Sequence, residues 1–291
     1  MIPDFCAMIL THGRPNHVPT YRVLRNGGYT GPIVIVIDNE DDTADEYRER
    51  FGSEVVMFDK KAVADMIDEA DNFSDRRSIV YARNAAFDIA EELGYTYFIQ
   101  LDDDYTYWSY CFDEDMNFLY RPVKRLDDAF RYLLDYYKAT PAKSLCIAQT
   151  GDYIGGENAG MAQEPMMKRK AMNTFICSTE RRFQFNGRIN EDVNAYTLLG
   201  SRGELFLTVN LMRINQGDTQ KSEGGMTDIY LVNGTYIKSF YTVIHCPSSV
   251  RIGMIGDKHP RIHHQIRWNN TVPKILNEDI RRPDKNGGET E

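Results

Sequence analysis

Three consecutive carboxylates, Asp102, Asp103 and Asp104, are the residues of this sequence best suited to chemistry. They follow an apolar run over residues 98–101, which is typical of a buried strand, so they stand where that strand ends. Adjacent like charges repel, and a divalent cation, a basic partner or shifted pKa values must compensate. Because Mg²⁺ and Mn²⁺ hold phosphates through one or two carboxylates, the acids predict a metal-diphosphate site. A solvated acidic turn is the alternative interpretation.

A second pair of acids, Glu191 and Asp192, ends a loop over residues 185–192 that contains Gly187. One acid of such a pair can act as a general base while the other orients it. A structural interpretation is equally good, because acids in the first turn of a helix stabilise its N-terminus and a helix is expected over residues 193–200. The residues alone leave both interpretations open.

Histidine provides the third set of candidates. His245, at the end of an expected strand over residues 236–245, and the pair His263 and His264 could each complete a metal site begun by the acids. A lone histidine is more often structural, and the sequence contains no HExxH motif or paired cysteines that would indicate catalytic zinc. The phosphate-binding GxxxxGK[ST] and GxGxxG motifs and the GxSxG motif of hydrolases are also absent.

The elements that position these residues alternate between strands and helices. Apolar runs predict strands at 4–10, 33–37, 54–58 and 95–101, and helices are expected between them at 21–28, 43–51 and 76–93. This alternation indicates an α/β fold, with a mostly parallel sheet that has helices on both faces. Ligands of such sheets bind beyond the carboxyl ends of the strands. Residues 11–14 and Asp38 therefore share one edge with the three aspartates.

The second part of the chain is less regular. A helix is expected over residues 129–138, and strands are expected at 144–149, 173–178 and 205–209. The glycine- and methionine-rich stretch 151–167 has little periodicity and is predicted to be a flexible loop that could close over the site. Residues 283–291 have the composition of a frayed tail. Residues 1–282 are thus predicted to form one large domain.

Charge is distributed unevenly along the 291 residues. The net charge is −9, but residues 38–75 alone hold 14 acids and 4 bases, so the remainder is close to neutral. Basic stretches at 168–170, 181–182 and 251–282 leave room for a polyanionic partner on one face. The five scattered cysteines predict no disulfide framework. The sequence shows neither a membrane span nor a signal peptide, so a cytoplasmic protein without a membrane partner is expected.

Several segments together resemble known enzymes. The chain resembles nucleotide-sugar-dependent glycosyltransferases of the GT-A class, in which a DxD-type motif after a central strand holds Mn²⁺ or Mg²⁺ on the donor's diphosphate. More specifically, it resembles the phage TET-associated glycosyltransferase-like family. The matching segments lie at 11–15, 81–84, 101–105, 185–194, 224–228, 238–240 and 263–268. The resemblance implies a GT-A fold with a nucleotide-sugar-binding half at 1–110 and an acceptor-binding half at 111–282.

The resemblance also implies roles for individual residues. Thr11, Arg14 and Asp38 would contact the uridine and ribose, Arg83 would face the diphosphate or the edge of the nucleotide, and Lys238 could also meet the diphosphate. Asp102 and Asp103 would contact the donor, while Asp102 and Asp104 would hold the metal together with one histidine, which is His245, His263 or His264. Glu191 and Asp192 would lie beside the acceptor, where such an acid acts as base in inverting members of the class.

The function that follows is transfer of a sugar from a UDP-sugar to the hydroxymethyl group of a modified base, such as 5-hydroxymethylcytosine, in phage DNA. Tyr105, Tyr107 and Trp108 could stack on that base or on the sugar, or they could be core residues. One alternative keeps the GT-A fold and places the sugar on a protein or polysaccharide. Another is a non-catalytic module that binds nucleotides or DNA, against which the intact acids argue.

Overall fold

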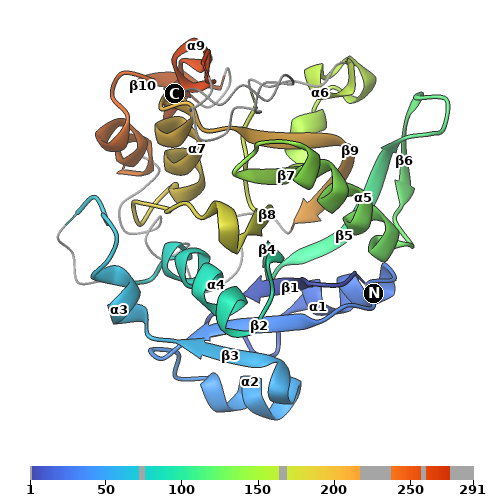
Figure 1. The fold of residues 1–291 in the computed structure, drawn as a ribbon. Helices are drawn as coiled ribbons and strands as arrows, with labels where there is room; N and C mark the ends of the chain where they lie inside the picture. The colour runs from blue at the N-terminus through green and yellow to red at the C-terminus, as the bar shows by residue number, and fades with distance from the viewer. Residues whose placement is uncertain (1, 72–75, 164–168, 217–236, 257–259, 276–291) are drawn as a thin grey trace, which may run out of the picture.

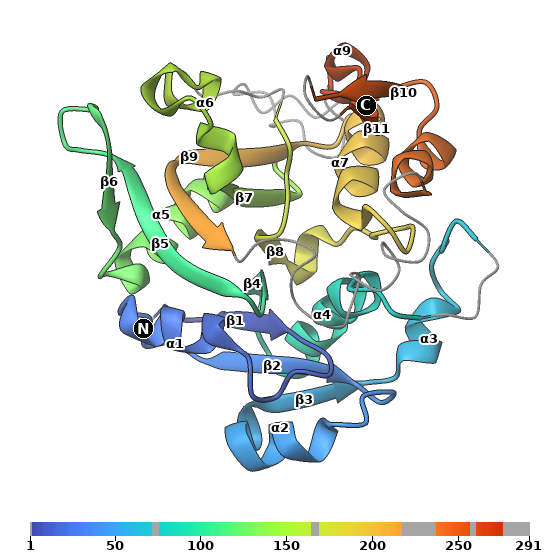
Figure 2. The same cartoon turned by 180° about the vertical axis from the view of Figure 1, so that it is seen from behind.

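The computed structural model describes residues 2–71, 76–163, 169–216, 237–256 and 260–275 of the chain. A nine-stranded sheet crosses it, with the strand order β3-β2-β1-β4-β8-β7-β9-β5-β6, and a separate pair of strands, β10 and β11, lies beside α7 and α9 (Figures 1 and 2). The predicted tail at 283–291 and the segment 224–228 lie outside the described residues.

The first four strands of the sheet are parallel, as predicted. They are β1 (Phe5–Leu10), β2 (Ile33–Asp38), β3 (Val55–Phe58) and β4 (Tyr97–Asp102). Every residue of β1 and β2 is buried, which explains their uninterrupted apolar sequences: a strand covered on both faces has no solvent side for polar residues. The carboxyl ends of β1, β2 and β4 consequently meet at one edge of the sheet, beside residues 11–14, Asp38 and the three aspartates.

The remaining strands mix both directions. They are β5 (Tyr105–Phe112), β6 (Phe118–Pro122), β7 (Ser144–Gln149), β8 (Phe175–Ser178) and β9 (Phe206–Gln216). Only the pair β7 and β9 is parallel, whereas β8 runs antiparallel to both β4 and β7, and β5 runs antiparallel to both β6 and β9. The α/β class is therefore confirmed, and its parallel character is concentrated in the N-terminal half.

Helices cover both faces of the sheet, as the alternation predicted. On one face lie α1 (Pro19–Asn26), α2 (Ala44–Phe51) and α5 (Leu126–Ala139); on the other lie α3 (Lys60–Ala64), α4 (Val80–Glu92) and α7 (Glu191–Ser201). Alternate residues of β1 serve the two cores, because successive side chains of a strand point to opposite faces. Ala7 and Ile9 belong to one core cluster, and Cys6 and Met8 to the other.

Local residue chemistry explains several boundaries. Pro19 opens α1, where its missing N–H costs no hydrogen bond, and the Asp59 side chain caps α3 by accepting from the Ala62 N–H at 3.0 Å. Gly94, with φ of 77°, follows α4 and takes the left-handed conformation that ends a helix. Short 3₁₀ turns η1 (Gly52–Glu54) and η4 (Thr179–Arg181) complete the connections.

Two predicted segments differ from the structure. Residues 237–245 form a helix rather than a strand, so His245 ends a helix. The stretch predicted as a flexible loop at 151–167 contains η2 (Thr150–Tyr153), η3 (Gly156–Asn158) and α6 (Gly160–Gln163), while 164–168 lie outside the described residues. Tyr153 and Met161 of this stretch pack in a small apolar cluster with Cys111, which explains its order.

The C-terminal described part consists of β10 (Val250–Ile255), β11 (Arg261–Ile266) and α9 (Trp268–Thr271). The strands β10 and β11 pair antiparallel with each other. All five cysteines are buried and free, as expected from their scattered positions. Among the described residues, no helix is long and apolar enough to cross a membrane.

Candidate active site

At the end of β4, the side chain of Asp103 contacts other residues than the side chains of Asp102 and Asp104 do. Asp103 points into the protein, where its carboxylate accepts from the Thr11 hydroxyl at 2.7 Å and from Arg14 Nη2 at 2.9 Å. Asp102 and Asp104 face the other way and share a neighbour at the end of β9, since Gln216 Nε2 lies 3.4 Å from Asp102 Oδ2 and 3.3 Å from Asp104 Oδ2. The two alternate acids of the motif are thus brought together, and the middle one is used internally.

The pKa values of the two paired acids are raised. Burial is the largest cause for both, and it raises the pKa of Asp102 to about 7 and that of Asp104 to about 6, with further contributions from the neighbouring aspartates. The charge of Arg83 opposes this shift at Asp102. In addition, Asp104 Oδ1 is buried and has no hydrogen-bond partner among the described residues. Raised pKa values and an unsatisfied oxygen mark a pair of acids in which Arg83 pairs with Asp102 alone and Asp104 keeps an oxygen without a partner in the described part of the chain.

These features fit a divalent cation. Mg²⁺ and Mn²⁺ take oxygen ligands, often from only one or two carboxylates together with substrate phosphates, and a cation would satisfy the orphaned Asp104 oxygen. Among the described residues, no group of three or more histidine, cysteine or acidic side chains could hold a metal. The two carboxylates Asp102 and Asp104 are the candidate protein ligands at this place. Neither His245 nor His264 joins them in a cluster of three or more candidate ligands among the described residues.

Arg83 joins the strand end to the second acid pair. Its side chain is 2% exposed, and it donates from Nη2 to Asp102 Oδ1 and from Nε to Glu191 Oε1, both at 2.9 Å. A third nitrogen, Nη1, lies 3.3 Å from the Asn173 carbonyl. The predicted contact of Arg83 with a diphosphate remains a prediction, because in this structure its donors serve the protein. Its arrangement instead fixes β4 relative to the start of α7.

The acid pair Glu191 and Asp192 opens α7, and both residues are 8% exposed. Burial and the charge of Asp192 raise the pKa of Glu191 to about 7, against the influence of Arg83. Asp192 accepts from the Val193 N–H through Oδ1 at 2.7 Å, while its Oδ2 has no hydrogen-bond partner among the described residues. Each acid lies in the first helical turn, as the structural interpretation predicts, and the role of either acid as a general base remains a prediction.

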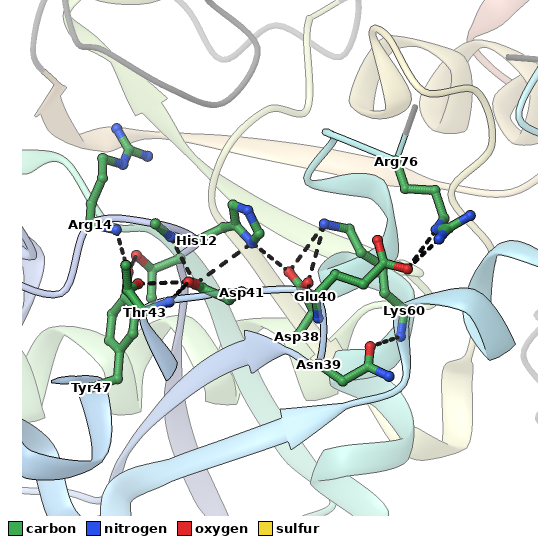
Figure 3. A network of polar contacts seen from close by, with 12 residues as sticks. His12, Arg14, Asp38, Asn39, Glu40, Asp41, Thr43, Tyr47, Lys60 and Arg76 are labelled. Carbon is green, nitrogen blue, oxygen red and sulfur yellow. Dashed lines mark hydrogen bonds and ion pairs between the residues drawn. The ribbon is translucent and has the colours of Figure 1, made fainter. Parts of the chain in front are cut away.

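Thr11 and Arg14 follow the end of β1, and both form hydrogen bonds with the hydroxyl of Tyr47 in α2. The Thr11 hydroxyl shares a 2.7 Å hydrogen bond with the Tyr47 hydroxyl, which also accepts from the Arg14 N–H at 2.9 Å (Figure 3). Arg14 Nη2 and Asp103 Oδ1 form an ion pair in which the arginine side chain is 28% exposed. This bonding fixes the loop after β1, and the contact of these residues with a nucleoside remains a prediction.

Asp38 lies at the end of β2 in a network of charged side chains (Figure 3). His12 Nδ1 lies 2.8 Å from Asp38 Oδ2, and Lys60 Nζ lies 3.2 Å from the same oxygen, with both the Lys60 and Asp38 side chains buried. Burial alone would raise the pKa of Asp38, but the bond from His12 and the charge of Lys60 outweigh it, so the pKa is lowered. Asp38 is consequently ionised at neutral pH beside the end of β1.

The remaining predicted residues follow α7 in the chain and lie near the loop that precedes this helix. His264 Nδ1 is 3.4 Å from Asn190 Nδ2, and burial lowers the pKa of His264 to about 3, so its ring is neutral. His245 is near Gly187 and 3.9 Å from Asp68, and burial lowers its pKa as well. Burial also lowers the pKa of Lys238, although Asp192 and Glu191 oppose this. Their roles toward a metal or a diphosphate remain predictions.

Sequence reasoning missed three residues that shape this site: Gln216, Lys60 and Tyr47. Each reaches the site from a separate element, β9, α3 or α2. Only Tyr47 carried a signal, because an aromatic residue in an otherwise acidic helix has to face the core. The predicted aromatic residues divide: Tyr105 and Trp108 are core residues, whereas Tyr107 is 43% exposed.

Comparison with known proteins places the site in a family. The model of the TET-associated glycosyltransferase family matches residues 5–225. The chain belongs to this family. The match extends over the whole nine-stranded sheet and includes Arg83, Asp102, Asp104 and the acids that open α7, so the predicted family is confirmed. No curated protein matches this member of the family.

Solved structures similar to this family member include two glycosyltransferases. One is TarS of S. aureus, residues 1–349 with UDP bound, with 14% identity, a TM-score of 0.42 and 72% of this chain covered. Another is the mannosyltransferase PcManGT of Pyrobaculum calidifontis with GDP-Man and Mn²⁺, with 12% identity, a TM-score of 0.48 and 84% covered. The chain spans 60% of the first and 63% of the second.

Proposed function

We propose that the protein is a metal-dependent glycosyltransferase of the GT-A type that transfers a sugar from a UDP-sugar to the hydroxymethyl group of a modified base, such as 5-hydroxymethylcytosine, in DNA. The observation that carries the proposal is the buried connection from Asp102 through Arg83 to Glu191. It joins acids suited to a metal-diphosphate to acids suited to an acceptor. Membership of the TET-associated glycosyltransferase family supports the same reaction.

The donor half of the reaction uses the end of β4. A divalent cation held by Asp102 and Asp104 would supply positive charge to the diphosphate that leaves. Arg83 keeps Asp102 in place through the 2.9 Å ion pair, and Asp38, ionised beside His12, supplies an acceptor for N–H or hydroxyl groups of the nucleoside. These residues bind and orient, so their contribution is positional.

The acceptor half uses the start of α7. Asp192 Oδ2 accepts the proton of the hydroxymethyl group, whose oxygen then forms a bond to the anomeric carbon of the sugar as the bond from that carbon to UDP breaks. Asp192 suits this role better than Glu191, because Arg83 already engages Glu191. The products are the glycosylated base and UDP, and the proton is passed on from Asp192.

A release assay tests the proposal. The protein is incubated with Mn²⁺ and a panel of UDP-sugars, with GDP-sugars as donor controls, and UDP is measured in the presence of a hydroxymethylcytosine duplex, an unmodified duplex or no DNA. The proposal expects UDP release that the modified duplex stimulates. Release without such stimulation would favour a protein or polysaccharide acceptor, and no release from any donor would favour a non-catalytic module.

A further inference from the structure

An open groove lies against β10, β11 and α9. Its volume is about 810 Å³, and no acidic residue lines it. The lining side chains are basic, amide, aromatic and aliphatic: Arg251, Gln265, Ile266, Arg267, Trp268, Asn269 and Asn270. We refer to this set of residues as the hairpin groove. Such a combination of donors with an indole differs from the acidic and aliphatic linings expected for a metal or a lipid.

The charge around the hairpin groove contrasts with that of the whole chain. The described residues 248–256 and 260–272 include Arg251, Arg261 and Arg267 and contain no aspartate or glutamate, whereas the chain as a whole carries a net charge of −9. The charged side chains of these described residues are all basic, although the chain as a whole is acidic. The complement of such a basic region is an anionic partner.

The side-chain amides of Gln265 and Asn270 donate to the Met254 and Ser248 carbonyls, whereas most of the other side-chain donors that line the groove have no partner among the described residues. Among the described residues, the side chains of Arg267 and Asn269 form no hydrogen bond or ion pair, and Arg267 is exposed. Arg251 uses Nε to donate to Gln265 Oε1 at 3.0 Å, which fixes the direction of its guanidinium and leaves its terminal nitrogens without a partner among the described residues. Planar guanidinium and amide donors that face solvent are suited to the phosphate oxygens of a nucleic acid backbone.

The residues that line the groove pack against α7, the helix whose first turn holds the candidate general base Asp192. The Trp268 ring stacks on Tyr196 of α7 with ring centres 5.9 Å apart and an angle of 9°. A side chain at Gly200 would collide with the Thr271 carbonyl, at 2.3 Å, so the close approach of α9 and α7 requires this glycine. At the other end of α7, His264 of β11 lies beside Asn190, which precedes Glu191. Figure 2 shows the arrangement.

The groove and the acids at the start of α7 are placed so that a nucleotide rotated out of a DNA duplex could reach from one to the other. Trp268, which lines the groove, stacks on Tyr196, and Tyr196 follows Asp192 by four residues in α7, a rise of roughly 6 Å along the helix. Enzymes that modify a base in duplex DNA rotate the nucleotide out of the stack and hold the flanking backbone on the protein. A backbone bound at the groove would leave such a base beside α7.

From the donors that have no partner and the lack of carboxylates among the described residues of this region, and from the attachment to α7, we infer that the hairpin groove binds the phosphate backbone of duplex DNA that flanks the base to be modified. The inference rests on the proposed function for its acceptor. Arg251 and Arg267 supply the phosphate contacts, and Asn269 and Trp268 border the backbone. The groove contacts phosphate and sugar, so it contributes affinity without reading sequence.

Fluorescence anisotropy of a labelled, unmodified duplex tests this surface without any sugar donor. Binding is compared between 50 and 200 mM salt for the wild type, the double variant Arg251→Glu, Arg267→Glu, and a control double variant Arg22→Glu, Arg121→Glu. The control makes the same charge change at exposed arginines outside the groove. The groove variant is expected to bind at least tenfold more weakly, with a salt slope reduced by about 2, and the control is expected to bind like the wild type.

The inference would be overturned by no measurable duplex binding by the wild type, by equal losses in both double variants, or by tighter binding of a duplex RNA at the same surface. A milder variant, Arg267→Ala, guards against misfolding, because that side chain has no internal partner to lose; its melting temperature should equal that of the wild type. The proposed function fails separately: the wild type would then bind duplex DNA through the groove and add no sugar to a modified base. Conversely, a groove variant that binds and glycosylates DNA like the wild type would refute only the groove.

Discussion

Arg83 and Asp102 form a buried ion pair, with 2.9 Å between Nη2 and Oδ1, that fixes α4 against the end of β4. The same guanidinium reaches Glu191 at the start of α7, and only 2% of the arginine is exposed. Two carboxylates with raised pKa values therefore share one cation. The ion pairs of Arg83 thus join the end of β4 to the start of α7, although Arg83 and Glu191 are 108 positions apart in the sequence.

Replacing Arg83 should cost far more stability than replacing a surface arginine with similar partners. Arg83→Leu leaves two buried acids without their cation, and we expect the free energy of unfolding to fall by about 3–5 kcal/mol, as measured by urea denaturation. Arg182→Leu is the matched control, since Arg182 also pairs with two acids, Asp88 and Glu91. Solvent screens that exposed group, so its loss should be below about 1 kcal/mol. Similar losses in the two variants would contradict the assigned role.

Asp104 and Asp103 should respond in opposite ways to alanine. Asp104→Ala removes a buried carboxyl oxygen that lacks a partner, so the metal-free protein should melt at an unchanged or higher temperature while Mn²⁺-dependent UDP binding weakens at least about tenfold. Asp103→Ala breaks the bonds to Thr11 and Arg14 and should lower the melting temperature. Calorimetry of UDP binding with and without Mn²⁺ measures the first effect. Wild-type binding by Asp104→Ala would refute the metal assignment.

The two acids that open α7 should separate by kinetics. Asp192→Asn should retain UDP affinity and lower turnover by roughly 10²- to 10⁴-fold, the range typical for loss of a general base. Glu191→Gln weakens the ion pair with Arg83 and should mainly lower stability. Initial rates and urea denaturation of both variants provide the comparison. Turnover that survives in Asp192→Asn but is lost in Glu191→Gln at unchanged stability would reverse the assignment.

Asp38 predicts a dependence of stability on pH. Its folded-state pKa is lowered below the ordinary value of 3.8, so its contribution is fully present above that value and is lost as the pH falls through the folded-state pKa. Asp38→Asn should destabilise the protein at pH 7, because Lys60 is then buried without its partner. The difference from the wild type should stay constant from pH 7 to 5 and shrink below about pH 4. Denaturation curves at these pH values that show a constant difference throughout would contradict this role.

The N-terminal half of the fold could be predicted from the sequence because burial on both faces leaves an unmistakable pattern. The strands β1, β2 and β4 are uninterrupted apolar runs, and the acids after them lie at the predicted edge. The strand β5 was missed because its polar and aromatic residues follow no single apolar run. Residues 237–245 were misassigned because Tyr241 and Ile244 favour strands, whereas tertiary contacts such as that from Asn190 to the Lys238 carbonyl hold a helix.

The sequence predicts which types of residue form the site, but it does not predict the hydrogen bonds and ion pairs between them. The pairing of Asp102 with Asp104 depends on Gln216, which β9 brings to them from 112 positions away in the chain. Likewise, the direction of Arg83 depends on where α4 packs, and no local pattern encodes that packing. Spacing along the chain therefore indicates which residues can do chemistry, while the mixed second half of the sheet decides which of them meet.

Nucleoside mass spectrometry tests the central claim most directly. The wild type, Asp104→Ala and Asp192→Asn are each incubated with Mn²⁺, a panel of UDP-sugars and duplex DNA that contains either 5-hydroxymethylcytosine or unmodified cytosine, and the DNA is then digested. We predict the added mass of a hexose or pentose on the hydroxymethylated nucleoside alone, with the wild type only. A sugar adduct on unmodified cytosine, an adduct that both variants form at the wild-type rate, or no adduct with any donor would contradict the account.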